Sequence, residues 1–483
     1  MSSLADAMIA SADVAIIDRQ GAVTYAQLRA RIERVRGALE RRGVRSGDAV
    51  LIVTANERES VVAYNATVEL GAMAVLSQVG SGARELRAAC ASTNPVLVLV
   101  SPPAATSDLA LPVGIPMAAI AELDGEPAAA RTVVDPDARR LVIFTSGTTS
   151  EPKGVIHSAR SLRAATENFQ ALLELAAEDR VFLVSPLASI TGVLQALELA
   201  PLVGAGAVLE SDFDAERSLD LLISARATAY GGPDLVLDRM LGVARRRGVG
   251  VPIRIAALGG TMLRRELIDV AERNFGIRVV RVYGSSEAPC STGTRPTETE
   301  AVRLVDEGMP RPGVELRLAA DGQLLVRGPH LFVGYVGVSG GEPRVDGWFP
   351  TGDEAEITDG RLRVIGRLKD VVSRNGKKIS LAEVEDAFVA ASGLTDCAAF
   401  GVADIDTGER VAVAVHAPSG TEIDVPVVLG AMEVQGLARW KLPESIVRFG
   451  DALPVTATGK IQRRALHEDG EILWRADRLH RRD

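Results

Sequence analysis

Strand-like and helix-like segments alternate along most of this 483-residue chain. Val50–Val53 is an apolar run typical of a buried strand, and a helical stretch follows it and ends near Gly71. Further along, Ile253–Leu258 leads through two glycines into an amphipathic helical segment, Leu263–Phe275, and Arg278–Tyr283 returns as a strand. Repeated units of this kind predict an α/β fold in which helices cover mostly parallel sheets. Ligands of such sheets bind beyond the carboxyl ends of the strands.

The pattern changes after about Gly313, and the chain is too long for one ordinary core. Short strand-like pieces such as Glu315–Leu318 and Leu324–Arg327 are separated by turns, which predicts antiparallel strands in a small barrel-like part. A compact α+β segment follows, with helices expected at Leu381–Ala391 and Val425–Trp440. We therefore expect a large N-terminal domain over residues 1–368 and a smaller, mobile C-terminal domain over residues 369–483.

Composition narrows the function classes. The net charge of −9 argues against nucleic acid as a partner, because a phosphate backbone attracts a basic surface. The three cysteines and five histidines show no disulfide or metal-ligand spacing. No apolar run reaches the roughly 18 residues of a membrane span, and the N-terminus has no secretory pattern. We therefore expect a cytoplasmic protein, with a homodimer as the default assembly.

A phosphate-binding loop is predicted directly after the apolar run Leu141–Phe144. The ten residues Thr145–Gly154 hold four hydroxyl side chains up to Thr149, two glycines and Lys153. These groups give a polyphosphate hydrogen-bond donors, room for the backbone to approach and a compensating charge. The lysine precedes the last glycine, so the stretch differs from the usual P-loop. Taken alone, it is also typical of an ordinary polar surface loop.

Four further motifs carry groups that a nucleotide site needs. Tyr283–Glu287 ends a strand and offers an aromatic face for a base and one carboxylate for magnesium, which takes few protein carboxylates beside phosphate oxygens. Gly347–Asp353 ends on a carboxylate that can accept ribose hydroxyls. The basic segment Gly366–Val372 and the motif Leu453–Arg464 complete the set. Each motif taken singly is also typical of a cap, a turn or a solvated surface.

Together the five motifs resemble those of the acyl-adenylate-forming superfamily, which includes acyl-CoA synthetases and adenylation domains. They occur in the family's order over residues 141–464, and this joint occurrence is far more specific than any one motif. The resemblance implies that a carboxylate attacks the α-phosphate of ATP to give acyl-AMP and pyrophosphate. A nucleophile, most often the thiol of coenzyme A, then displaces AMP. The implied cofactors are ATP and magnesium, with coenzyme A as cosubstrate.

The resemblance also implies residue roles. Lys460 would bridge the carboxylate and the α-phosphate, with Glu287 as the metal ligand and Thr148 as a further catalytic residue. Lys369 would be the hinge about which the C-terminal domain rotates, which withdraws Lys460 after the first step. The implied ATP-binding residues are Thr145, Ser146, Gly147, Thr148, Thr149, Lys153, Gly259, Gly260, Tyr283, Gly284, Ser285, Ser286, Asp353, Arg367 and Lys460. Among these, the resemblance implies that Tyr283, Gly259 and Gly260 frame the adenine and that Asp353 and Arg367 hold the ribose hydroxyls. The implied residues of the acid pocket and thiol tunnel are Ser189, Tyr230, Gly231, Asn375 and Gly376.

One segment, Ser185–Gly192, departs from the family pattern. Relatives often carry an aromatic residue and a histidine where Ala188 and Ser189 stand. No aspartate stands there to pair with a substrate amine, which disfavours an α-amino acid because its ammonium would be buried unpaired. We therefore predict an AMP-forming acid–thiol ligase that joins a small non-amino carboxylic acid to coenzyme A. Three alternatives stay open: transfer to a carrier-protein thiol or an amine, a non-catalytic nucleotide-binding protein, and a phosphoryl-transferring kinase.

Overall fold

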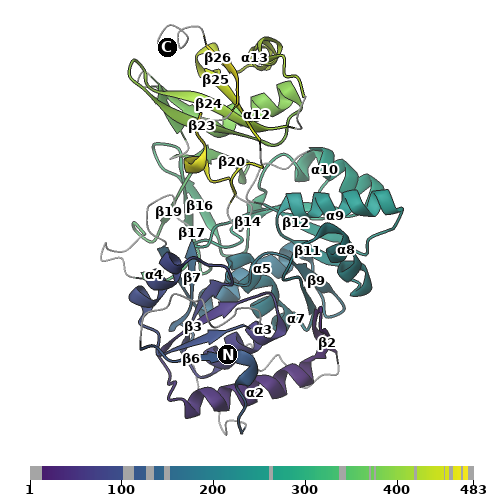
Figure 1. Ribbon diagram of the computed structural model, residues 1–483, viewed down its shortest axis with the longest axis vertical. Helices are drawn as coiled ribbons and strands as arrows, with labels where there is room; N and C mark the ends of the chain where they lie inside the picture. Colours follow the sequence, from purple (N-terminus) through teal and green to yellow (C-terminus); the bar gives the residue numbers. More distant parts are fainter. Residues whose placement is uncertain are drawn as a thin grey trace. The chain divides into compact units, whose positions relative to one another are not determined.

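The computed structural model describes residues 13–101, 114–126, 135–145, 153–259, 265–336, 344–368, 371–374, 377–417, 421–450, 452–455, 461–468 and 471–476. The chain divides into two compact units (Figure 1). Unit 1 comprises Met1–Leu316 and Val326–Phe349, and unit 2 comprises Arg317–Leu325 and Pro350–Asp483. The segment from Pro350 to Leu368 thus groups with the C-terminal part, and the domain boundary at Leu368 stays a prediction.

A mostly parallel sheet of nine described strands forms one half of unit 1. Its inner pairs from β1 to β13 are parallel, and antiparallel strands stand at both edges. In sheet order the strands are β15 (Met309–Pro310), β14 (Thr292–Gly293), β13 (Arg278–Tyr283), β12 (Ile255–Leu258), β11 (Ala229–Gly231), β9 (Arg180–Leu183), β10 (Gly206–Leu209), β1 (Val14–Asp18) and β2 (Gly21–Thr24).

A second sheet, of seven described strands, forms the other half of unit 1. Its central strand β3 (Ala49–Thr54) is buried at every position, as expected for an apolar, β-branched strand covered on both faces. The order is β18 (Gly334–Val336), β8 (Lys153–Ser158), β7 (Arg139–Thr145), β4 (Met73–Gln78), β3, β5 (Leu97–Val100) and β6 (Met117–Ala119). The pairs from β6 to β7 are parallel, whereas β7, β8 and β18 run antiparallel.

Helices cover these sheets because apolar residues recur at helical spacing along them and form a face that packs on the sheet. In α5 (Ala159–Leu173), for example, Leu162, Ala165 and Phe169 point into the core, and Ser158 caps the first turn by accepting from Ser161 N–H. The other helices of unit 1 are α2 (Tyr25–Arg41), α3 (Arg58–Glu69), α4 (Ala83–Thr93), η1 (Ile120–Glu122), α6 (Ile190–Gly192), the π-helix η2 (Val193–Leu199), α7 (Ala200–Val203), α8 (Ala215–Ser224), α9 (Asp234–Arg247), α10 (Arg265–Asp269), the π-helix η3 (Val270–Asn274) and α11 (Glu300–Arg303).

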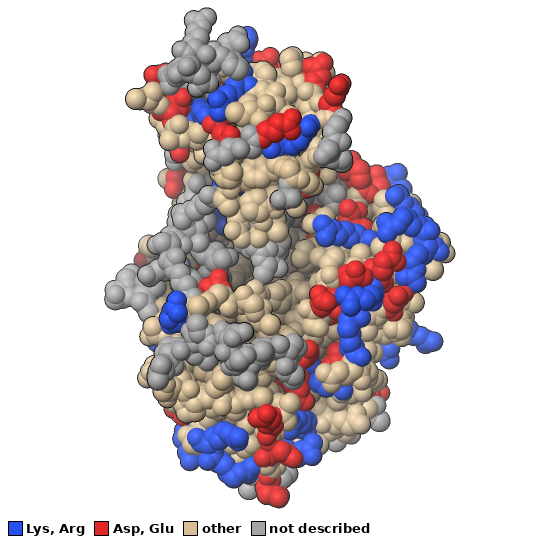
Figure 2. Space-filling view, viewed as in Figure 1, with Lys and Arg blue, Asp and Glu red and all other residues tan. Residues whose placement is uncertain are grey.

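The outer face of α8 and α9 carries mixed charge. Arg246 and Arg247 of α9 reach the acidic side chains of α8, at 3.3 Å from Glu216 and 2.8 Å from Asp220. Figure 2 shows basic and acidic side chains interspersed over this part of the surface. These two arginines therefore form ion pairs with acidic side chains of the neighbouring helix.

Two further sheets lie wholly or mostly in unit 2. A four-stranded sheet has the order β16 (Glu315–Leu318), β17 (Gln323–Arg327), β19 (Phe349–Thr358) and β20 (Arg361–Arg367). The second contains β22 (Lys377–Ser380), β21 (Val371–Arg374), β24 (Gly408–His416), β25 (Ser445–Phe449) and β26 (Glu471–Arg475), with β23 (Cys397–Asp404) paired to β24. Its helices are α12 (Leu381–Ser392), α13 (Val425–Val434), η4 (Arg439–Lys441) and η5 (Arg463–Ala465). The described elements confirm the expected α/β class.

Candidate active site

The motif Tyr283–Glu287 forms a tight turn where β13 ends. A side chain at Gly284 would place its Cβ 2.5 Å from the Cys290 nitrogen, so glycine alone fits there. Ser285 closes the turn, because its hydroxyl accepts from the Glu287 N–H at 3.2 Å and from the Ala288 N–H at 3.1 Å. The turn therefore fixes the backbone of Glu287 directly beyond the carboxyl end of a parallel strand, where ligands of such sheets bind.

A buried histidine supports the same turn from the next sheet. His157 Nε2 in β8 lies 2.8 Å from the Ser286 carbonyl oxygen, and Nδ1 lies 3.1 Å from Ser161 Oγ. Because a carbonyl oxygen only accepts, Nε2 must carry the proton. Burial lowers the pKa of His157 to about 4, so the ring is neutral near pH 7. The sequence offered no spacing that pairs this histidine with the Glu287 motif.

Tyr335 contacts two charged side chains that the sequence analysis assigned to ATP and magnesium, Lys153 and Glu287. Its hydroxyl donates to Glu287 Oε1 at 2.9 Å, and Lys153 Nζ lies 5.3 Å from the centroid of its ring. Strand β18 carries Tyr335 opposite Val155 of β8, and Phe332 N–H donates to the Glu287 carbonyl oxygen at 2.8 Å. Sequence reasoning missed Tyr335, because the contact depends on a strand pairing between distant segments. Lys153 and Glu287 thus both contact the side chain of Tyr335.

The Glu287 carboxylate fits a magnesium site of the kind that ATP completes. Magnesium is typically held by one or two protein carboxylates, with phosphate oxygens and water supplying the remaining ligands. Among the described residues, no group of three or more His, Cys, Asp or Glu side chains could hold a metal ion. A single fixed carboxylate beside a lysine therefore matches a metal whose other ligands come from the nucleotide.

The adenine-binding residues predicted from the sequence share one sheet edge. Strands β12 and β13 pair in parallel with Leu258 opposite Arg281, so Gly259 and Tyr283 leave the sheet together. A Cβ at Gly259 would lie 2.1 Å from the Val282 carbonyl oxygen, which leaves room only for glycine. The register thus places Gly259 at the same sheet edge as Tyr283, which begins the Glu287 motif.

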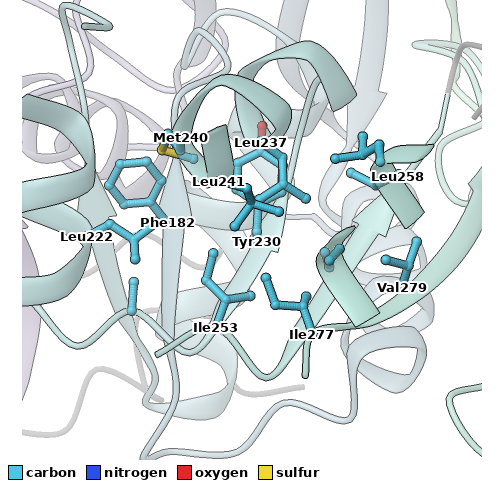
Figure 3. Packing of buried hydrophobic residues seen from close by; sticks show 14 of the residues in the cluster. Phe182, Leu222, Tyr230, Leu237, Met240, Leu241, Ile253, Leu258, Ile277 and Val279 are labelled. Carbon is cyan, nitrogen blue, oxygen red and sulfur yellow. The ribbon is translucent and has the colours of Figure 1, made fainter. Parts of the chain in front are cut away.

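Three residues predicted to line the acid pocket make contacts with nearby parts of the protein. Tyr230 is fully buried in the core between α9 and the nine-stranded sheet (Figure 3), and its hydroxyl donates to the Pro233 carbonyl oxygen at 2.7 Å. Ser189 caps α6 by accepting from the Gly192 N–H at 3.1 Å. Gly231 packs against Gln195 of η2, which donates to its carbonyl oxygen at 2.8 Å. Contact of these residues with a substrate stays a prediction.

The predicted ribose-binding pair lies within unit 2. Asp353 of β19 stands opposite Arg367 of β20, with Arg367 Nε at 3.4 Å from Asp353 Oδ1. The Asp353 N–H donates to Thr351 Oγ1 at 3.1 Å, and the aspartate is 9% exposed while the arginine side chain is half-exposed. The two residues assigned to the ribose are therefore neighbours across an antiparallel pair.

The phosphate loop joins the two strands of a hairpin, because Thr145 of β7 pairs with Lys153 of β8. Most of this predicted loop and Lys460, the predicted catalytic lysine, lie outside the described residues. The predicted site residues that fall outside them are Ser146, Gly147, Thr148, Thr149, Gly260, Lys369, Asn375, Gly376 and Lys460.

Family comparison agrees with this arrangement. The family of AMP-binding enzymes matches residues 7–336, and the C-terminal domain of AMP-binding enzymes matches residues 383–460. The chain belongs to the AMP-binding enzyme family. This membership confirms the acyl-adenylate-forming superfamily that the five motifs predicted.

Relatives within the AMP-binding enzymes are similar over almost their whole length. The chain is 30% identical to an indoleacetate–CoA ligase of Aromatoleum aromaticum, covering 91% of this chain and 92% of that protein. It is 29% identical to a feruloyl-CoA synthase of an Amycolatopsis species, with the same coverage. The ATP-bound structure of MatB from Rhodopseudomonas palustris superposes with a TM-score of 0.85 at 26% identity, covering 96% of this chain and 98% of that one. In the described part of this chain, no helix is long and apolar enough to cross a membrane.

Proposed function

We propose that this chain is an ATP-dependent, AMP-forming ligase that activates a non-amino carboxylic acid and transfers its acyl group to coenzyme A. The observation that carries the proposal is the meeting of Lys153 and Glu287 at Tyr335. A lysine for phosphate oxygens and a carboxylate for magnesium are the charges that a bound ATP requires. Family membership and the names of the relatives support coenzyme A as the acceptor.

In the first step, an oxygen of the substrate carboxylate bonds to the α-phosphorus, and the bond to the leaving pyrophosphate breaks. Lys153 would balance the charge of the β- and γ-phosphates, and Lys460 would stabilise the charge that grows on the α-phosphate oxygens. Magnesium held at Glu287 would supply neutralising charge at the phosphates. The turn at Ser285 and the neutral His157 keep the Glu287 backbone in place for this step.

Separate sets of residues would hold the ribose and the adenine. Asp353 would accept the two ribose hydroxyls, and Arg367 would fix the direction of that carboxylate. Tyr283 and Gly259 would frame the adenine, because both leave the edge formed by β12 and β13. Glycine at position 259 is required by the close approach of the Val282 carbonyl oxygen, 2.1 Å from where a Cβ would lie.

In the second step, the sulfur of coenzyme A bonds to the acyl carbon, the carbon–oxygen bond to AMP breaks, and the thiol proton passes to solvent. Rotation about Lys369 would withdraw Lys460 and bring Asn375 and Gly376 to the thiol tunnel. These four positions rest on the family resemblance alone. The cytoplasmic location and a homodimer also stay predictions from the sequence.

An aromatic monocarboxylic acid is the substrate class to test first. The relatives named for indoleacetate and ferulate support this choice. The segment before η2 carries only the small side chains Ala188 and Ser189 where relatives often have an aromatic residue and a histidine, and the Ser189 hydroxyl already caps α6. This segment offers no charged group for a second carboxylate or an amine.

The test is pyrophosphate release from ATP over a panel of aromatic, alicyclic and alkanoic acids, with coenzyme A or hydroxylamine as the acceptor. We expect AMP, pyrophosphate and acyl-CoA in equal amounts with one class of acid. Hydroxamate without acyl-CoA would contradict the choice of acceptor and favour a carrier-protein thiol or an amine. ADP in place of AMP would contradict adenylation itself.

A further inference from the structure

We propose that Tyr335 is a positioning residue that fixes both the Glu287 carboxylate and the Lys153 ammonium for the ATP–magnesium complex. This inference rests on the proposed function, which makes Glu287 a metal ligand and Lys153 a phosphate contact. The two charges come from segments that are far apart in the sequence, and Tyr335 contacts both.

The hydroxyl of Tyr335 sets the direction of the carboxylate. It donates to Glu287 Oε1 at 2.9 Å, so rotation of the carboxylate about its last bond would break this hydrogen bond. Partners that bind a metal-ligating carboxylate in this way orient it and tune its affinity for the ion.

The ring of Tyr335 limits the position of the lysine. Lys153 Nζ lies 5.3 Å from the ring centroid, within the range of a cation–π contact. This contact uses the face of the ring, so it occupies none of the ammonium's N–H donors in a conventional hydrogen bond. Lys153 can therefore stay on the ring while its N–H groups bind phosphate oxygens.

The backbone around Tyr335 is fixed to both partners. Strand β18 pairs with β8, which carries Lys153, with Gly334 opposite Ile156 and Tyr335 opposite Val155. On the other side, Phe332 N–H donates to the Glu287 carbonyl oxygen, and the Phe332 ring packs edge-on against Tyr335 with centroids 4.8 Å apart. The Tyr335 side chain is therefore held close to both the Glu287 carboxylate and the Lys153 ammonium.

Two substitutions separate the hydroxyl from the ring. Tyr335→Phe removes the hydrogen bond and keeps the ring, whereas Tyr335→Leu removes both. Glu287→Gln serves as the comparator, and Tyr25→Phe as the control, because Tyr25 donates its buried hydroxyl to the Ala205 carbonyl oxygen and belongs to no part of the proposed site. The readout is ATP binding by calorimetry, titrated with Mg²⁺ and repeated in EDTA.

We expect Tyr335→Phe to raise the half-saturating Mg²⁺ concentration about 10- to 100-fold without changing ATP binding in EDTA. Tyr335→Leu should in addition weaken binding in EDTA about two- to fivefold, because the cation–π contact is lost. Tyr25→Phe should lower the melting temperature and leave the Mg²⁺ dependence unchanged. The double variant of Tyr335→Phe with Glu287→Gln should lose no more Mg²⁺ affinity than Glu287→Gln alone.

Suppose that folded Tyr335→Phe keeps the wild-type Mg²⁺ dependence while Glu287→Gln weakens it. That result would overturn the role of Tyr335 and leave the proposed function intact. Additive losses in the double variant would overturn it as well. If Glu287→Gln itself keeps the wild-type Mg²⁺ dependence, the assignment of Glu287 as the metal ligand fails and the inference falls with it.

Discussion

His157 Nε2 lies 2.8 Å from the Ser286 carbonyl oxygen, so a neutral histidine from the seven-stranded sheet supports the turn that follows a strand of the nine-stranded sheet. This contact joins the strand that follows the phosphate loop to the turn that presents Glu287. A shift of either sheet would therefore change the distance between Lys153 and Glu287.

Acidification should destabilise the protein through His157. Burial lowers its pKa to about 4 from an ordinary value near 6.5, so the unfolded chain binds a proton between these values and the folded chain does not. Stability is therefore unaffected above the unfolded pKa and falls as the pH drops from about 6.5 towards 4, by about 2 kcal/mol at pH 5. His330, whose pKa is also lowered to about 4 by burial, should contribute in the same direction.

The measurement is thermal unfolding of wild type and His157→Phe between pH 7.5 and 4.5. The variant should be less stable at pH 7 by about 1–3 kcal/mol, since the Ser286 carbonyl loses its donor. Its stability should also fall less steeply between pH 6.5 and 5. An equal slope in both proteins would show that His157 titrates normally in the folded state.

Removing the Asp353 carboxylate should weaken ATP binding through the ribose. Asp353 is nearly buried and faces Arg367 across β19 and β20. Hydrogen bonds to a charged group contribute about 1.5–3 kcal/mol, so Asp353→Ala should raise the ATP dissociation constant about 10- to 100-fold. The control ligand is 2′,3′-dideoxy-ATP, which wild type and variant should bind equally. A preserved preference for ATP over this analogue in the variant would contradict the ribose assignment.

Much of this site followed from local patterns, because parallel strands place their carboxyl ends at one edge. The run predicted at Arg278–Tyr283 is β13 with the same bounds, and the run at Ile253–Leu258 contains β12. Their register places Gly259 and Tyr283 at the same sheet edge, and their contact with adenine stays a prediction. Asp353 and Arg367 lie in two separate motifs. Only the family resemblance indicated from the sequence that these two residues act together.

The remaining features depend on contacts between distant segments or on backbone details. Tyr335 joined the site through the pairing of β18 with β8, which a single sequence does not reveal. The helix expected over Val425–Trp440 ends at Val434, because Gly436 adopts φ +102° after it and stops the helix. Tyr230, predicted at a pocket, belongs to a core cluster whose partners come from several strands and helices.

A methyl group at Gly259 should displace the sheet edge that is proposed to hold the adenine. The added Cβ would lie 2.1 Å from the Val282 carbonyl oxygen, and a backbone atom of a neighbouring strand cannot move aside cheaply. Gly259→Ala should destabilise unit 1 by about 1–3 kcal/mol and weaken AMP binding. Gly250→Ala is the matched control, because its Cβ would meet no atom within 4 Å. Unfolding and AMP titrations check both; equal AMP affinity in the two variants would contradict the placement of adenine at this edge.

Replacing Lys460 should slow the first half-reaction and leave the rate of the second unchanged. If this lysine stabilises the charge on the α-phosphate, Lys460→Ala should slow pyrophosphate release about 10²- to 10³-fold, as expected for the loss of one strong electrostatic contact in a transition state. Thioester formation from synthetic acyl-AMP and coenzyme A should proceed at the wild-type rate, because the proposed domain rotation withdraws this lysine before the second step. Lys441→Ala is the control, since Lys441 contacts Glu383 at 2.6 Å within unit 2 and has no role in the proposed mechanism. Equal losses in both half-reactions of Lys460→Ala would instead indicate a general structural role and contradict the alternation between two domain positions.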